Sequence, residues 1–135
     1  MPRKGSVWAE DPQIDAFRRT KPRIAAACET FIVTELKPRF LPTVTPSDEF
    51  NYPVDIVGGW HGNAYRFMVR YRCGGENRTA DGFDAPFARL EGKAPDLFDI
   101  SWHRHTGKWH PMFADVTLAE ASDLMLSVPT LQPVC

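Results

Sequence analysis

Apolar residues follow a helical period in the first third of the chain. Asp11-Pro12 is a typical helix start, with Asp as the N-cap and Pro at the first helical position. Pro22 predicts a restart or a kink, and Pro38 predicts the end of the helix. We therefore predict a long helix over residues 12–37. Its apolar stripe consists of Ile24, Cys28, Phe31, Ile32 and Leu36.

The middle of the chain changes to an alternation of apolar and polar residues. Over residues 65–72, rings and Val alternate with three arginines and a Met, which is the period of a half-exposed strand. Pro86 lies inside another strand candidate and marks it as an edge or irregular segment. The further predicted strands cover residues 54–60, 83–90, 98–103 and 108–113.

The last periodic segment is helical again. Thr117 and Glu120 fit the capping-box pattern, and Pro129 ends the apolar stripe that follows. The order of helix, strands and helix predicts an α+β two-layer sandwich. In this fold a four- to five-stranded antiparallel sheet is covered by an N-terminal helix and a short C-terminal helix.

Length and composition fit one such domain. A chain of 135 residues with 43% apolar content can bury one core but is too short for two ordinary domains. We expect the domain over residues 11–130, between a flexible N-terminus over 1–10 and a C-terminal tail over 131–135. No segment has the apolar length of a membrane span or a secretory signal. The 3 cysteines are far apart, which favours a reducing, cytoplasmic location.

Three of the 4 histidines lie in one predicted hairpin, which reads SWHRHTGKWHP over residues 101–111. If its turn has two residues, Thr106 and Gly107, the strand alternation gathers three imidazoles on one face of the sheet. Imidazole nitrogens are good ligands for divalent metals such as zinc. The candidate metal ligands in this register are His103, His105 and His110.

A second register fits the same hairpin. A type I turn at His105-Thr106, followed by Gly107 at positive φ, pairs His103 with Trp109. This register turns His110 to the other face, because a slip of one residue reverses every side chain. We favour it, since Gly107 is then the residue that tolerates the left-handed conformation best. In this register the histidines are part of a solvent-facing hairpin, and we expect no cofactor.

The polar face of the strand over residues 65–72 is the second candidate site. Guanidinium groups suit phosphate and carboxylate recognition, and rings nearby can stack on bases. Such alternation is also typical of an exposed strand whose arginines pair with acids on its neighbours, such as Asp55 or Asp99. With a net charge of −1, the chain would bind anions or nucleic acid weakly, through a local patch. The candidate residues are Arg66, Arg70, Arg72 and Arg78.

The sequence leaves catalysis open and favours a non-catalytic role. It contains no nucleophile elbow, P-loop or dinucleotide fingerprint. Cys73 ends the arginine strand, where Arg70 and Arg72 would lower its pKa, but no histidine is placed beside it by the sequence. Tryptophans and open strand edges favour a binding or assembly module on the exposed sheet face, either as a homo-oligomer or with a protein partner.

Several segments of the chain resemble a family of small bacterial domains of unknown function. They are the Cys28-Glu29 step, AYRFMVRYR, FDISWHRHTGKWHP and TLAEASDLM. The matching motifs are the TGKW turn over residues 106–109 and the helix from Thr117, and the resemblance covers most of residues 24–128. The loops over 42–50 and 73–97 do not match. The resemblance implies the helix–strands–helix order and, since the family has no assigned activity, no site residues.

Overall fold

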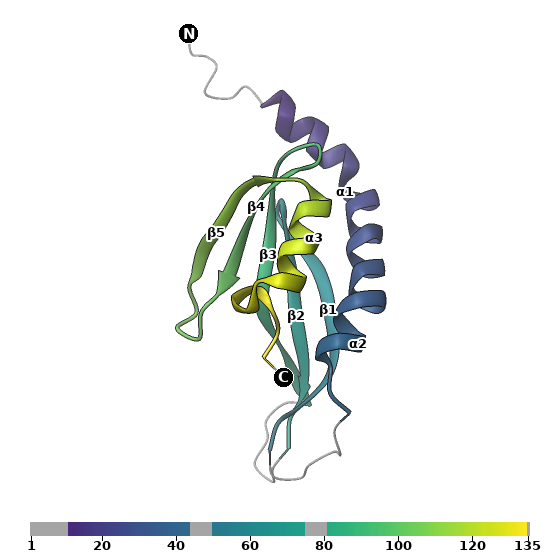
Figure 1. The fold of residues 1–135 in the computed structure, drawn as a ribbon, viewed down its shortest axis with the longest axis vertical. Coiled ribbons are helices and arrows are strands. Elements are labelled where there is room, and N and C mark those ends of the chain that lie inside the picture. Colours follow the sequence, from purple (N-terminus) through teal and green to yellow (C-terminus); the bar gives the residue numbers. More distant parts are fainter. Residues whose placement is uncertain (1–10, 44–49, 75–80, 135) are drawn as a thin grey trace.

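The computed structural model describes residues 11–43, 50–74 and 81–134. It has two layers, a five-stranded antiparallel sheet and a layer of helices on one of its faces (Figure 1). The strands follow one another in the sheet in chain order. They are β1 (Tyr52–His61), β2 (Ala64–Arg72), β3 (Gly82–Ala94), β4 (Leu97–His103) and β5 (Trp109–Val116). The helices are α1 (Pro12–Phe31), α2 (Lys37–Phe40) and α3 (Leu118–Ser127).

This arrangement confirms the predicted α+β fold. The N-terminal and C-terminal helices both pack on the same face of the antiparallel sheet, and the opposite face is open (Figure 1). No helix among the described residues is both long enough and apolar enough to cross a membrane. The predicted N-terminal segment over 1–10 and Arg78 lie outside the described residues.

The first helical stretch runs from Pro12 to Phe40 through three consecutive elements, slightly beyond the predicted 12–37. Asp11 caps it by accepting a hydrogen bond from the Gln13 backbone N–H at 2.8 Å, and α1 is unbroken across Pro22. The ribbon changes direction along its length, as expected for a helix with an interior proline (Figure 1). A π-helical turn over Ile32–Leu36 then leads into α2. Pro38 does not end the helix, because the π-helical turn before it changes the hydrogen-bond pattern, with the Lys37 backbone N–H donating to the Ile32 carbonyl, and the helical backbone continues to Phe40.

Phe17 of α1 is the centre of the packing between the two layers. Its ring meets the ring of Trp60 edge to face at 5.9 Å and that of Phe98 at 5.8 Å. Gly92 lies directly under it, and a Cβ there would overlap the Phe17 ring. The apolar stripe predicted for the first helix is buried between the helices and the sheet, apart from Phe31, which is half-buried. The buried residues of this first helical stretch are Phe17, Ile24, Cys28, Ile32 and Leu36.

The pairing of β3 with its neighbours explains how Pro86, predicted to lie in an edge or irregular segment, is tolerated inside this strand. The strand is central in the sheet, but β4 pairs with it only from Ala88 onward, so Pro86 has a strand neighbour on one side. The register with β2 also shifts here, since Phe67 faces Ala88 whereas Met68 faces Pro86. Phe87 is therefore the extra residue of a β-bulge. Both features remove the need for a Pro86 backbone N–H.

The capping box at the start of α3 is formed as predicted. The Glu120 backbone N–H donates to the Thr117 hydroxyl at 3.1 Å, and the Thr117 backbone N–H donates to the Glu120 carboxylate at 2.8 Å. After α3, a 3-10 turn over Pro129–Leu131 places Leu131 in the core. The Tyr71 hydroxyl donates to the backbone carbonyl of Val134 at 2.9 Å and connects this residue to β2.

Candidate functional site

The open face of the sheet carries the polar side chains of β2 and β3. Alternate residues of a strand share a face, so Arg66 and Arg70 both point away from the helices. The strand register gives these two arginines different neighbours. Arg70 lies opposite Asp84, whereas Arg66 lies opposite another arginine, Arg89. The predicted arginine face therefore consists of two chemically distinct ends.

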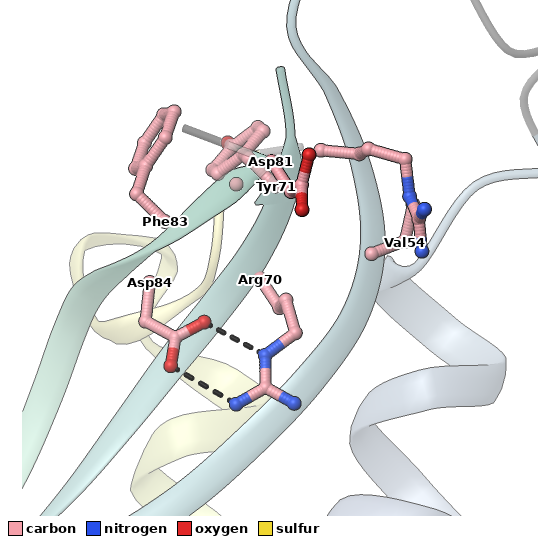
Figure 2. Close-up of a pocket in the computed structure, with 8 residues that line it drawn as sticks. Val54, Arg70, Tyr71, Asp81, Phe83 and Asp84 are labelled. Carbon is pink, nitrogen blue, oxygen red and sulfur yellow. Dashed lines mark hydrogen bonds and ion pairs between the residues drawn. The ribbon is translucent and has the colours of Figure 1, made fainter. Parts of the chain in front are cut away.

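At the Arg70 end the guanidinium is already bound by a carboxylate. Its Nε and Nη2 donate to the two carboxylate oxygens of Asp84 at 2.9 and 3.1 Å, and Figure 2 shows the two side chains facing each other. These hydrogen bonds lower the pKa of Asp84, and the same pairing raises the pKa of Arg70. Arg72 and Phe83 line the open pocket of about 470 Å³ beside this pair. Asp84 therefore occupies two of the Arg70 donors and neutralises its charge, which leaves Arg70 a weaker partner for an anion.

At the Arg66 end two guanidinium groups share one indole. The Cζ atoms of Arg66 and Arg89 lie over the Trp109 ring, at 5.6 and 4.6 Å from its centroid. Among the described residues, Arg66 has no carboxylate within ion-pair distance, and Arg89 has only Glu91, at 3.9 Å. The Nε atoms of both arginines are buried and find no hydrogen-bond acceptor among these residues. As far as the described ranges go, this site therefore has two positive charges and almost no compensating negative charge.

The β4–β5 hairpin places Trp109 at this site. Gly107 has a φ of 85°, its backbone N–H donates to the Arg104 carbonyl at 2.9 Å, and the Arg104 N–H donates to the Lys108 carbonyl at 2.8 Å. This is the turn that ends in a glycine at positive φ, and it pairs His103 with Trp109. The favoured register is confirmed, and it puts the Trp109 ring on the open face.

His103 completes the site. Its ring meets that of Trp109 edge to face, with the centroids 4.9 Å apart. Burial lowers the pKa of His103, and the positive charges of Arg66 and Arg89 lower it further. The imidazole is therefore mostly neutral at pH 7 and adds a hydrogen-bonding group rather than a third charge.

The histidines predicted as metal ligands are not brought together. His110 lies on the opposite face from His103, and its ring centroid is 5.5 Å from that of Trp102. His105 is exposed at the tip of the turn. Across residues 11–43, 50–74 and 81–134, no group of three His, Cys, Asp or Glu side chains could hold a metal ion.

Within the part of the chain that the structure describes, neither cysteine, Cys28 or Cys73, forms a nucleophilic centre with these groups. Burial raises the pKa of the Cys28 thiol to about 12, with a smaller contribution from the charge of Glu29. A buried thiol of this kind stays protonated and behaves as a small apolar residue. Cys73 follows β2 at the end that carries Arg70. It is therefore away from the site formed by Arg66, Arg89, His103 and Trp109, here called the Trp109 site.

Comparison with known proteins places this chain in a family. Residues 15–127 match the family described as Domain of unknown function (DUF3024). The chain belongs to the DUF3024 family. No curated protein and no solved structure matches it. The resemblance to a domain family of unknown function is thus confirmed, while a bacterial origin remains a prediction.

The DUF3024 match runs from residue 15 within α1 to the end of α3 and therefore includes every residue of the Trp109 site. Two members of that site, Arg89 and Trp109, were not among the residues that the sequence predicted. The favoured hairpin register already placed Trp109 beside His103, but it did not connect the hairpin to the arginine strand. No sequence signal marked Arg89, because its strand has an irregular pattern around Pro86. Chemically, this DUF3024 site offers paired guanidinium donors beside an aromatic surface, which suits an anionic ligand.

Proposed function

We propose that this chain is a non-catalytic binding module that holds an anionic ligand on the open face of its sheet. The observation that carries the proposal is the Arg66–Arg89 pair, two like charges directly opposite each other on neighbouring strands. Like charges in this position destabilise a sheet. A bound phosphate or carboxylate would remove that repulsion and accept hydrogen bonds from both guanidinium groups.

The environment of the two arginines supports this use. Stacking on Trp109 restricts the guanidinium groups before any ligand arrives, so less side-chain freedom is lost on binding. The Nε atoms are covered by the packing, which leaves the terminal nitrogens as the donors. Arg89 keeps 25% of its side chain exposed, so the residue is accessible to a ligand.

A role in assembly is the alternative use of the same face. Between the two arginine ends, β1, β2 and β3 place Val57, Met68 and Pro86 in one half-buried row. A second copy or another protein that packed on this row would also cover Arg66 and Arg89. It would then have to supply carboxylates, because burying unpaired charges is costly. The geometry therefore favours an anionic ligand over an apolar contact.

Calorimetric titration with tripolyphosphate at low salt tests the proposal. Arg66→Ala should weaken binding about ten- to a hundredfold, the effect of losing a hydrogen bond from a charged donor. Arg70→Ala is the matched control. It removes the same charge from the same strand face, but the arginine that it removes is already paired with Asp84. Equal effects of the two substitutions, or no binding by the wild-type protein, would contradict the proposal. A mass measurement on the same samples detects assembly.

A further inference from the structure

The tip of the β4–β5 hairpin extends the positive surface beyond Arg66 and Arg89. Arg104 and Lys108 flank the turn, and no acidic residue occurs between Asp99 and Asp115. The turn itself is exposed from His105 to Lys108. Its positive charges therefore have no acidic partner within the hairpin.

The acids of this hairpin lie at its other end, where they are already engaged. The Lys93 ammonium donates to Asp115 at 2.6 Å and to Asp99 at 3.3 Å. Asp99 also accepts a hydrogen bond from the Asp115 backbone N–H at 3.1 Å. The negative and positive groups of the hairpin are thus separated along its length. This separation leaves a basic surface at the tip even though the whole chain has a net charge of −1.

An arginine contacts a tryptophan ring on each face of the hairpin. On the open face the Cζ atom of Arg89 lies 4.6 Å from the Trp109 centroid. On the other face the Cζ atom of Arg104 lies 5.7 Å from the Trp102 centroid. The two rings are on opposite faces because Trp102 pairs with His110 whereas Trp109 pairs with His103. Both faces of the hairpin therefore carry a cation in contact with an aromatic ring.

This chemistry is that of proteins that bind single-stranded nucleic acid, in which basic groups follow the phosphates while rings and guanidinium planes stack on bases. On the basis of the proposed anion site, we infer that the ligand of this chain is a single-stranded nucleic acid. Its phosphates contact Arg66 and Arg89, and its neighbouring nucleotides lie along the hairpin tip at Arg104 and Lys108. A small phosphate would leave the tip unused, and an acidic peptide would offer no bases to the rings.

Fluorescence anisotropy with a short labelled oligothymidylate and the full chain tests the inference. Arg104→Ala/Lys108→Ala should weaken binding at least about tenfold and lower the salt slope by about 2, since two phosphate contacts are lost. The control Arg19→Ala/Arg23→Ala removes the same charge from exposed positions on α1 and should leave binding near the wild-type value. Lys108→Glu alone is the second tip variant, because it leaves the Arg104 contact with Trp102 in place.

Three ligands separate this inference from the anion site on which it rests. Tripolyphosphate should bind equally well to the wild type and to the tip double variant. An abasic oligomer of the same length should bind at least about fivefold more weakly than oligothymidylate, because stacking is lost. Equal binding of oligothymidylate, the abasic oligomer and polyglutamate, or equal effects of the tip and α1 variants, would overturn the inference and leave the anion site standing. Failure of tripolyphosphate as well would overturn both.

Discussion

Arg66 and Arg70 lie on the same face of the same strand, and their surroundings differ in charge. Arg70 lies opposite Asp84 and forms two hydrogen bonds with it, so its charge is neutralised within the sheet. Arg66 lies opposite Arg89, and the two guanidinium groups share the ring of Trp109 instead. The strand register thus decides whether an arginine on this face is neutralised within the sheet, as Arg70 is, or keeps its charge, as Arg66 does.

The two ends also differ in what holds the side chains. The Arg70–Asp84 pair is largely exposed, with 51% and 32% of the two side chains accessible, and exposed ion pairs contribute little to stability. At the other end an aromatic ring positions the cations. At the Arg70 end the ion pair mainly neutralises the charge of Arg70. At the Arg66 end the Trp109 ring holds the two positive charges of Arg66 and Arg89 close together.

The largest effect is expected from Arg89→Glu, which gives Arg66 an acid in the position that Asp84 has opposite Arg70. Tripolyphosphate affinity should fall at least about tenfold, because one donor is lost and a negative charge is added. The free energy of unfolding should rise by about 0.2–1 kcal/mol, since an opposite-charge pair replaces a like-charge pair. Calorimetry and urea denaturation measure the two quantities. Arg89→Gln controls for charge loss alone, and unchanged affinity in Arg89→Glu would refute the comparison.

The next effect concerns the turn that brings Trp109 to the Arg66 end. Gly107→Val places a β-branched residue at a φ of 85°. It should lower the free energy of unfolding by about 1–2 kcal/mol and weaken anion binding. Gly107→Asn is the control, because asparagine tolerates this conformation better. Urea denaturation would contradict the prediction if the two variants were equally stable.

A smaller effect is expected from Asp84→Asn, which frees Arg70 and makes its end resemble the Arg66 end. The salt slope of polyanion binding should increase by about 1, one additional phosphate contact. Because Arg70 lowers the pKa of Asp84, this carboxylate stabilises the fold above its ordinary pKa of 3.8, and the contribution is lost as the pH falls through the lower folded value. Stability of Asp84→Asn should therefore depend less on pH in that acidic range. Identical acid unfolding curves for variant and wild type would contradict this assignment.

The smallest effect is the titration of His103. Its folded pKa lies below the ordinary 6.5, so protonation costs stability, and the protein should become less stable as the pH falls below about 6.5. Arg89→Ala should raise the pKa of His103, and so should bound tripolyphosphate, because both remove positive charge from its surroundings. Two-dimensional NMR of the imidazoles measures these shifts. The exposed His105 is the internal control. If neither Arg89→Ala nor bound tripolyphosphate changed the pKa of His103, this residue would not belong to the site.

The comparison shows what the sequence could and could not predict. Period-two alternation identified the arginines of β2, and Gly107 identified the hairpin register, because both signals are local. The end of β3 was missed because Gly92 interrupts a strand pattern, although its missing side chain makes room for the Phe17 ring. The partners of Arg66 and Arg70 depend on the pairing of β2 with β3 across a long loop, which no local signal contains.

The bulge at Phe87 decides which charges the open face displays. Positions 84 and 89 differ by an odd number, so an uninterrupted strand would point Asp84 and Arg89 to opposite sides of the sheet. The extra residue reverses this parity and brings both onto the open face, Asp84 opposite Arg70 and Arg89 opposite Arg66. Deleting a single residue between them would turn one of the two toward the helices. The charge pattern of this surface is therefore encoded in the length of β3 as much as in its composition.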